Sequence, residues 1–507
     1  MPQNEKAIIR SLMDPAIPLD SIEIYDADYG TNKNSSMEGE PRDYKETKNV
    51  GTNFPYIEIN NYVFNQDEIL NFSIDYTGFL PKVSFKVFVK GKTFPSGAIP
   101  KDGDLASVFI RALNDTFKPI RNDYRITSVT SKGADSEGMY GAYTINGELF
   151  VPHLYDEVVV SYKGTSYNVL KEIARELKLG FASNDTATAD EQTWISPRTD
   201  YREYILSIAD HAWKDEQSFF DVFIDVYYNL NFVNINNQFS EDTNVDLALL
   251  TNLRITDTMG GETTEKQLTE LTGQTSKILT NWPDYKGTPG FIHRYNVSNK
   301  SNQVSQAYGY KTYTQFFEQN SEQYWSIYVD PLNTEGAGGN KIILKGRTTK
   351  PGTPSEDYWK TQARHVWMGI QYTAPEGNAH EKYNYAKLWN DRNNVELEKI
   401  TINIDLERGN FNLYRGERIP LILFVMNDIR HQTILNSPEQ EQPDAMYPSM
   451  ILDRFYSGYY MIAGMSFSYS QDSPISSMGM PTEENPRNPP GFIHKVYLTR
   501  REWPTPV

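Results

Sequence analysis

The stretch from Ser166 to Asn236 contains SYNVLKEIARELKLG at 166–180 and FDVFIDVYYNL at 220–230. In its first part apolar residues recur at helical spacing, and Gly180 follows as a helix stop. A second helix begins with Asp200 and Glu203 in a capping-box pattern and again places apolar residues on one face. The alternation over 220–230 then predicts one long strand with a single buried face. The stretch is therefore an α/β unit, and it carries no constellation of catalytic residues.

Two β-rich blocks flank this unit. Between Phe54 and Tyr162 the alternating pattern predicts about six short strands. This number of strands in so short a stretch is typical of a sandwich or a small barrel. The second block runs over 367–426, and with strands at 459–469 and 492–499 it predicts another barrel of similar size. Turn signals separate the strands of the first block at Asp102-Gly103, Asn122-Asp123 and Asn146-Gly147.

Two details of the pattern concern the second block. The apolar residues Val395 and Leu397 occupy odd positions of the alternating pattern, whereas those from Ile400 onward occupy even positions. A switch of this kind within one strand predicts a bulge at Glu398-Lys399. The block also ends on PGFIHK at 490–495, a near copy of PGFIHR at 289–294. This echo indicates either an internal duplication or a coincidence in an aromatic-rich chain.

The predicted fold class is mainly β with an α+β insertion, built from two β-barrels plus smaller accessory domains. The boundaries that the patterns favour are an N-terminal arm at 1–53, a first barrel at 54–165, an inserted α+β domain at 166–239, an irregular middle or accessory domain at 240–366, and a second barrel with a C-terminal tail at 367–507.

Composition restricts the classes of partner. The chain has 507 residues and a formal net charge of −17, which opposes stable contact with nucleic acid or anionic membranes and argues against sequence-specific nucleic-acid binding. The absence of cysteine excludes disulfides and thiolate metal sites. No secretory signal and no apolar run of membrane-spanning length are visible, so we expect a protein made in the cytoplasm without membrane insertion.

Searches for catalytic chemistry find no P-loop, no dinucleotide fingerprint, no nucleophile elbow and no zinc-protease motif. The seven histidines are scattered without ligand spacing. Asp221 and Asp225 share a strand face, but their Cα atoms would lie about 13 Å apart, too far for a retaining glycosidase pair. We therefore assign no catalytic residue, no metal ligand and no cofactor, and expect a protein that is not an enzyme.

The C-terminal run YLTRREWP at 497–504 has a different character. Arg500, Arg501 and Trp503 belong to the residue types most enriched at the energetic centres of interfaces. They are our candidate partner interface. The alternative is a mobile tail with an ordinary salt bridge.

The α/β unit and the C-terminus together resemble the central hub proteins of contractile-phage baseplates. The matching residues are Tyr167–Phe181, Trp194-Ile195, Tyr204–Trp213, Phe219–Asp225, Gly458–Ile462 and Leu498–Pro504. The family is related in fold to the first part of type VI secretion spike proteins, and each of its subunits carries two tube-protein-like β-barrels. The long N-terminal arm and the extended segment 240–355 depart from this plan.

What the resemblance implies is a structural protein of the virion. It would form a homotrimer whose six barrels adapt a six-fold tail tube to a three-fold central spike. The implied partners are the central spike protein and the tail tube protein, with tape-measure and baseplate wedge proteins as further candidates. Two alternatives stay open: a virion-associated carbohydrate-active enzyme or cell-wall hydrolase, which needs a carboxylate pair, and a peripheral receptor-binding tail protein.

Overall fold

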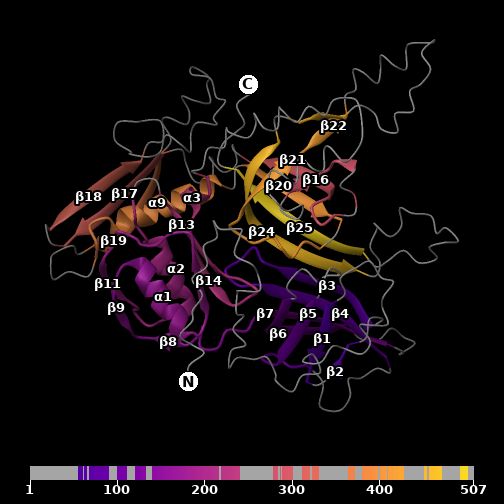
Figure 1. The fold of residues 1–507 in the computed structure, drawn as a ribbon. Helices are drawn as coiled ribbons and strands as arrows, with labels where there is room; N and C mark the ends of the chain where they lie inside the picture. Colours follow the sequence, from indigo (N-terminus) through magenta and orange to yellow (C-terminus); the bar gives the residue numbers. More distant parts are fainter. Residues whose placement is uncertain are drawn as a thin grey trace, which may run out of the picture.

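The computed structural model describes the chain at 55–60, 62–64, 68–90, 100–110, 120–132, 140–215, 218–239, 278–283, 286, 288–300, 311–319, 322–329, 363–371, 379–397, 400–407, 409–426, 450–453, 456–470 and 491–500. Within these residues the fold is mainly β with a few helices, as Figure 1 shows, and the predicted fold class is confirmed. None of the helices described is long and apolar enough to cross a membrane. The predicted N-terminal arm lies outside the described residues.

The first β block forms one curled antiparallel sheet. Its apolar side chains alternate with polar ones and point inward, where Phe64 packs against Phe85 with ring centroids 6.4 Å apart. The contact brings the loop after the second strand against the fourth strand, so the sheet closes around its own core. The strands are β1 (Pro55–Ile59), β2 (Tyr62–Val63), β3 (Ile69–Asp75), β4 (Lys82–Lys90), β5 (Leu105–Ile110), β6 (Ile120–Lys132) and β7 (Tyr140–Leu149).

Two of the three expected turns of this block lie inside strands. Asn122-Asp123 is part of β6 and Asn146-Gly147 is part of β7, whereas Asp102-Gly103 is a turn as predicted. A Cβ atom at Gly147 would lie 2.9 Å from the carbonyl oxygen of Arg125 on β6. The glycine therefore serves a close approach between strands, beside a register shift in β6, rather than a hairpin.

The second barrel is closed by a short strand from far upstream. Strand β15 pairs with β21 in parallel and forms a bridge from Thr280 to Phe291, just before β16. Strand β16 falls in the segment that the sequence assigned to the irregular middle, yet it pairs with β20 along its whole length. The strands are β15 (Leu279–Thr280), β16 (Ile292–Asn299), β20 (Ile400–Leu406), β21 (Arg418–Ile422), β24 (Gly458–Ser470) and β25 (Gly491–Thr499), with the separate pair β22 (Phe424–Met426) and β23 (Met450–Leu452).

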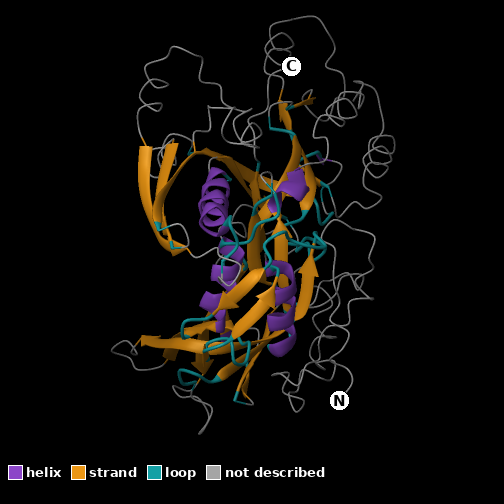
Figure 2. Ribbon diagram, turned by 90° about the vertical axis from the view of Figure 1, so that its left-hand side faces the viewer, coloured by secondary structure: helices purple, strands orange, loops and turns teal. Residues whose placement is uncertain are grey.

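Both barrels belong to one thirteen-stranded sheet, because β24 of the second pairs with β3 of the first. Figure 1 shows β24 and β25 of the second barrel next to β3 of the first, and Figure 2 shows strands along most of the length of the molecule. The edge strand of each barrel thereby pairs with the edge strand of the other, so neither of these two edges is exposed.

The repeated PGFIH motif has a structural counterpart. Its two copies begin β16 and β25, which flank β20 on opposite sides. Arg294 of the first copy and Lys495 of the second both lie opposite Asp405. The environments differ, since His494 is buried and His293 is exposed. The echo therefore corresponds to two similar strand starts on either side of one strand.

The α/β unit has the two predicted helices and the predicted cap of the second. The first helix ends at Glu176 with Leu177 as its C-cap, and Gly180, the predicted stop, is the first residue of the next strand. The side chain of Asp200 accepts a hydrogen bond from the backbone nitrogen of Glu203 at 2.7 Å, which opens the second helix. Strands β8 and β9 lie upstream of residue 166, yet they pair with β12 and β11 of this unit. Its elements are β8 (Glu157–Val158), β9 (Ser161–Gly164), α1 (Ser166–Glu176), β10 (Gly180–Ser183), β11 (Gln192–Ile195), β12 (Thr199–Asp200), α2 (Tyr201–Asp210), β13 (Phe220–Ile224), β14 (Asn229–Asn234) and α3 (Ile235–Phe239).

The single long strand expected over 220–230 was wrong, because the chain turns back after Ile224. Strand β13 ends there and β14 begins at Asn229 as its antiparallel partner. The carboxylate of Asp225 accepts hydrogen bonds from the backbone nitrogens of Tyr227 and Asn229, and Tyr228 adopts φ 58°. An aspartate that bonds its own backbone two residues on is a turn former, and this local effect overrides the alternating pattern.

A separate three-stranded sheet and a helix complete the described chain. The sheet orders β18 (Gln323–Val329), β17 (Lys311–Glu318) and β19 (Ala363–Gln371), so the region at 367 is not part of the second barrel. Helix α9 (Tyr383–Glu396) occupies the place where the sequence predicted strand residues. Val395 lies in this helix, so the strand expected there was wrong. The predicted bulge at Glu398-Lys399 lies outside the described residues.

Candidate functional site at the junction of the domains

Strand β24 changes partner in its middle. Its first residues pair with β21 up to Met461, and its last residues pair with β3 from Ser466 onward. Between the two, the backbone of Tyr76 donates to the carbonyl of Met465 at 2.8 Å. One strand therefore closes the second barrel with one half and joins the first barrel with the other.

The crossing point requires a residue without a side chain. A Cβ atom at Gly464 would lie 2.8 Å from Cγ2 and 3.1 Å from Cα of Thr77, which follows β3. Real side chains do not occupy such a position without moving the neighbouring backbone. The register shift that β24 shows against β25 between Ile462 and Gly464 lies at the same place. The joint between the barrels thus depends on close backbone contact.

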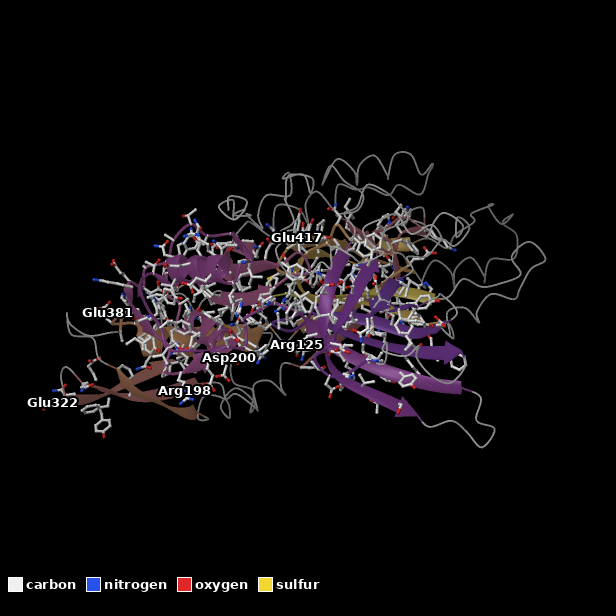
Figure 3. The ribbon with its side chains drawn as sticks, turned by 90° about the horizontal axis from the view of Figure 1, so that it is seen from below. Arg125, Arg198, Asp200, Glu322, Glu381 and Glu417 are labelled. Carbon is white, nitrogen blue, oxygen red and sulfur yellow. The ribbon has the colours of Figure 1, made fainter. Side chains whose placement is uncertain are left out.

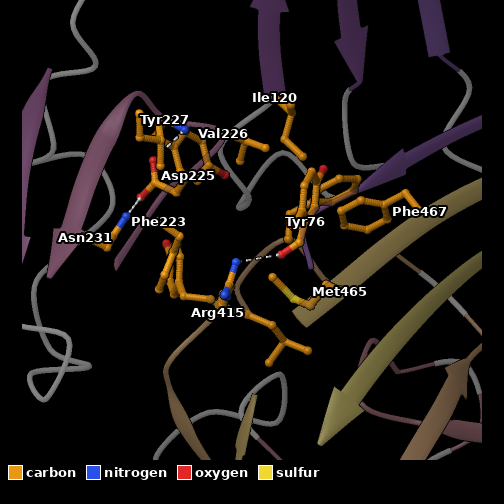
Figure 4. Close-up of a pocket in the computed structure, with 14 residues that line it drawn as sticks. Tyr76, Ile120, Phe223, Asp225, Val226, Tyr227, Asn231, Arg415, Met465 and Phe467 are labelled. Atoms are coloured by element: carbon orange, nitrogen blue, oxygen red, sulfur yellow. Dashed lines mark hydrogen bonds between the residues drawn. The ribbon is translucent and has the colours of Figure 1, made fainter. Parts of the chain in front are cut away.

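Arg415 links three parts of the molecule at this joint (Figure 4). It lies in a turn of the second barrel, and its guanidinium donates to the carbonyl of Gly78 after β3 and to Oδ2 of Asp221 on β13, the latter at 3.0 Å. The same group lies over the ring of Phe223, 4.2 Å from the centroid. Its side chain is 13 % exposed, so these bonds are largely shielded from water. The first barrel, the second barrel and the α/β unit therefore share one charged clamp.

A pocket lies beside this clamp, and its walls come from the same three parts of the molecule (Figure 4). Burial raises the pKa of Tyr76 well above its ordinary value, so the phenol stays neutral and packs as an aromatic ring. The lining is chiefly apolar: Tyr76, Ile120, Phe223, Ile224, Asp225, Val226, Tyr227, Asn231, Phe411, Leu413, Tyr414, Arg415, Met465 and Phe467. Such a set holds domains together and supplies no nucleophile paired with a base.

The two carboxylates weighed as a glycosidase pair have separate structural partners. Asp221 binds Arg415, whereas Asp225 accepts from the side-chain amides of Asn229 and Asn231 at 3.1 Å each. Among the residues described, no group of three or more His, Cys, Asp or Glu side chains is placed to hold a metal ion. The arrangement is that of a structural joint between domains.

A second joint fixes helix α9 on the α/β unit. The side-chain nitrogen of Asn390 donates to the carbonyls of Ala209, Asp210 and Ala212 at 3.3, 2.9 and 3.0 Å, and its oxygen accepts from the backbone nitrogen of Phe220 at 3.2 Å. These carbonyls lie at and just beyond the C-terminal end of α2, where helices leave acceptors without internal partners. One buried asparagine therefore caps a helix that precedes it by about 180 residues.

Aromatic and charged contacts extend the second joint. The ring of His211 stacks on Tyr383 at 3.9 Å with an interplanar angle of 12°, and Lys387 binds Asp210 at 2.9 Å. Burial lowers the pKa of His211 to about 4, because the charged imidazolium would lose its hydration here. The histidine is therefore neutral at pH 7.

Of the candidate interface residues, only Arg500 is described. Its guanidinium carbon lies 5.5 Å from the ring centroid of Tyr460, and Nη1 lies 3.5 Å from the carbonyl oxygen of Ser457. Arg500 thus packs against the start of β24. Arg501 and Trp503 lie outside the described residues, and their role in a partner interface stays a prediction.

Sequence reasoning missed the residues that make the joints, namely Arg415, Gly464 and Asn390. The turn around Arg415 was visible, but its partners Gly78 and Asp221 lie 337 and 194 residues away. No local pattern in the sequence predicts such contacts. A glycine inside a strand pattern was the one available signal, since it suggests a bulge or a close backbone approach.

Comparison with known proteins finds no matching family model and no matching curated protein. Comparison with solved structures finds several similar chains. A tail protein of Neisseria meningitidis MC58 is 10 % identical with a TM-score of 0.43, over 89 % of this chain and 97 % of that one. The 43 kDa tail protein of prophage MuSo2 from Shewanella oneidensis is 8 % identical with a TM-score of 0.46, over 89 % and 99 %. An E. coli component of the type VI secretion system, itself described as similar to T4 bacteriophage tail proteins, is 8 % identical with a TM-score of 0.38, over 89 % and 79 %.

Proposed function

We propose that the chain is the central hub of a phage tail baseplate, a homotrimer that joins the six-fold tail tube to the three-fold central spike. The observation that carries the proposal is the fusion of two barrels into one sheet by the pairing of β3 with β24. A chain that joins its own barrels edge to edge can join the barrels of neighbouring copies by the same chemistry. Three copies would then present six barrels.

The order of the strands supports this assembly. The path β16-β20-β25-β24-β3-β4-β7-β6 contains eight strands, and each pairs with the next in antiparallel fashion. Its two ends are open within the described residues, because β5 pairs with β6 only as far as Arg125 and β16 meets β15 only at Phe291. With an even number of alternating strands, β6 of one copy would meet β16 of the next in antiparallel orientation. Repetition of one head-to-tail contact then closes a ring.

The diameter of such a ring is large enough for a central channel. Three copies would contribute 24 strands in all, and at about 4.8 Å between strands their circumference is roughly 115 Å. This corresponds to a diameter of roughly 37 Å between backbones, well beyond barrels whose interiors are filled by side chains. The ring would leave an open bore, as a passage through a virion tail requires.

The same proposal makes the chain a structural protein of the virion. Its partners would be the tail tube protein on one side and the spike protein on the other, and the C-terminal run that begins at Arg500 is one candidate contact. The apolar pocket and the clamp at Arg415 support this reading, since they stiffen the connection between the barrels that such an adaptor must keep in register.

Engineered disulfides test the ring, because the chain has no cysteine of its own. We would pair Thr130→Cys on β6 with Arg294→Cys, Asn296→Cys or Ser298→Cys on β16. Under oxidation at least one pair should give covalent dimers and trimers in assembled particles, since adjacent strands bring Cβ atoms within disulfide range. The matched control pairs Thr130→Cys with Ser84→Cys on the interior strand β4, which should give none.

Two outcomes would overturn the proposal. One is the absence of covalent trimers for every β6–β16 pair while the particles assemble normally. The other is a copy number of the chain in the particle that is not a multiple of three. Imaging of particles with a labelled chain separates the hub from a peripheral receptor-binding protein by its position on the tail axis.

A further inference from the structure

A lysine, an aspartate and an asparagine meet at the end of β14. Nζ of Lys214, from the loop after α2, donates to both carboxylate oxygens of Asp185, at 2.7 Å to Oδ1 and 2.9 Å to Oδ2. Nδ2 of Asn234, the last residue of β14, donates to the same Oδ2 at 2.8 Å. Because each nitrogen lies within hydrogen-bond distance of one oxygen, the two nitrogens are less than about 6 Å apart.

The carboxylate and the amide are shielded from solvent. Asn234 is fully buried and the side chain of Asp185 is 7 % exposed, whereas the side chain of Lys214 is 34 % exposed. Another ion pair of the α/β unit lies in water: Arg198, labelled in Figure 3, and Glu157 pair at 2.9 Å with side chains 76 % and 64 % exposed. The pair of Lys214 and Asp185 is therefore not an ordinary surface salt bridge.

The asparagine is held in one position from several sides. The side chain of Asn184 accepts from the backbone nitrogen of Asn234 and donates to its backbone carbonyl, both at 2.8 Å. Nδ2 of Asn234 also donates to Oγ of Ser218 at 3.0 Å, and its Oδ1 accepts from the backbone nitrogen of Asn236 at 3.1 Å. A backbone N–H group at this oxygen stabilises negative charge that develops on it when a nucleophile adds to Cγ.

We propose that Lys214 and Asn234 form an intramolecular isopeptide bond, with Asp185 as the catalytic acid and base. A proton passes from the ammonium to the carboxylate, the free amine adds to Cγ of the asparagine, and the bond from Cγ to Nδ2 breaks. Nζ loses two protons in all and Nδ2 gains two, so ammonium leaves and the carboxylate is restored. The step needs no oxidant or reductant.

The position of the carboxylate suits this relay, because it contacts both nitrogens whose protons change. Cγ is bonded directly to Nδ2, so the amine of Lys214 reaches it by torsions of its own flexible four-carbon side chain. Well-oriented groups within one molecule react at effective concentrations of about 10⁵ M or more. A bond that amines and amides form slowly in solution can therefore be completed after the chain folds.

The crosslink would act as a disulfide does in other proteins, in a chain that has no cysteine. It would join residues 214 and 234 around the β13–β14 hairpin and so restrict the unfolded chain. Ser218, which accepts from Asn234, also accepts through its carbonyl from Nε1 of Trp389 on α9 at 3.0 Å. The bond would thus brace the part of the unit on which α9 packs. It concerns the fold of one chain and is independent of the proposed function.

The mass of the full chain tests the proposal, because the reaction releases one ammonia, a loss of about 17 Da. Intact-mass spectrometry should show this loss relative to the sequence, both for the purified chain and for the chain in assembled particles. Trypsin does not cleave after an acylated lysine. The tryptic fragment 203–254 should therefore stay in one piece and carry the whole loss.

Three variants locate the reaction. Lys214→Arg keeps the positive charge beside Asp185 but replaces the amine with a guanidinium that stays protonated, so the chain should have its full sequence mass. The matched control Lys387→Arg makes the same change where Lys387 pairs with Asp210 at 2.9 Å, and should keep the loss. Asp185→Asn removes the acid and base, and should slow the loss at least about a hundredfold in a time course after synthesis.

Full sequence mass of the wild type in both samples would overturn the proposal. So would a loss of ammonia with normal cleavage after Lys214, because that result marks a succinimide at an asparagine rather than a crosslink. Retention of the loss in Lys214→Arg would contradict it as well. If that variant fails to fold, as circular dichroism would show, the wild-type fragment 203–254 still decides, since its fragmentation spectrum identifies the joined residues.

Discussion

The joint between the two barrels and the joint between α9 and the α/β unit hold the molecule together by different means. At the first, β3 and β24 exchange backbone hydrogen bonds over five residue pairs, with serine, asparagine and aspartate on the outer face. At the second, backbone groups of the α/β unit are satisfied by the side chains of Asn390 and Trp389. Both joints connect segments far apart in the chain.

The two joints differ in how strictly they depend on particular residues. Backbone pairing is available to any strand with the right period, so it tolerates substitution on its outer face. Side-chain capping depends on single residues, because removal of one leaves several buried groups unsatisfied. We therefore expect single substitutions to break the α9 joint readily, and the barrel joint only where backbones touch.

The largest effect is expected for Asn390→Ala. The variant removes the side-chain partner of three carbonyls near the end of α2, of which that of Ala209 keeps a backbone donor, and of the backbone nitrogen of Phe220. It should lower the free energy of unfolding by about 3 kcal/mol. Urea denaturation followed by tryptophan fluorescence measures the loss. The control Asn296→Ala, on an exposed position of β16, should change stability by less than about 0.5 kcal/mol. Equal effects of the two variants would show that the α9 joint does not depend on its asparagine.

The next effect concerns the one sensitive point of the barrel joint. Gly464→Ala places a Cβ atom against Thr77 and should cost about 2 kcal/mol, the usual scale of overpacking. Thermal unfolding measures it. Because the clash involves Cγ2 and Cα of Thr77, the double variant Gly464→Ala with Thr77→Gly should recover part of the loss. A double-mutant cycle without coupling would indicate that the strain arises elsewhere.

The smallest effect is an acid sensitivity confined to the α9 joint. His211 has a pKa of about 4 in the fold and about 6.5 when unfolded, so the unfolded chain binds more protons between these values. Stability from this residue is fully present above pH 6.5 and declines as pH falls towards 4, by about 1–2 kcal/mol at pH 5. Hydrogen exchange at pH 7.5 and pH 5 should show α9 losing protection before β24 and β25.

The variant His211→Phe isolates that effect. It keeps an aromatic ring against Tyr383 and has no titrating group, so the protection of α9 should vary less with pH than in the wild type. The buried His494, whose pKa is lowered to about 3, remains in both proteins and cancels in the comparison. An unchanged pH dependence in His211→Phe would assign the acid sensitivity to another group.

Elements with a strong local signal could be predicted from sequence. Helices α1 and α2, the Asp200 cap of α2 and the last two strands β24 and β25 lie where the periodicity and the capping residues indicate. The failures have local causes too: the turn at Asp225, the glycine at 147 and the helix α9, whose apolar residues follow no clear amphipathic period. The resemblance to hub proteins rested on the same well-predicted segments.

The candidate site could not be predicted, because the contacts of Arg415, Gly464 and Asn390 that define it join residues distant in the chain. Arg415 was visible as a turn residue and Asn390 as one of many asparagines. What gives them their roles is the pairing of β24 with β3 and the placement of α9 beside α2.

By itself the sequence determined the local elements and their buried faces, because helix and strand periods and capping residues act over a few neighbouring positions. It also determined the absence of cysteine chemistry and the overall acidic balance. Only the tertiary structure decided which strands pair and where the two barrels join. Strand register couples residues hundreds of positions apart, and no local pattern carries that information.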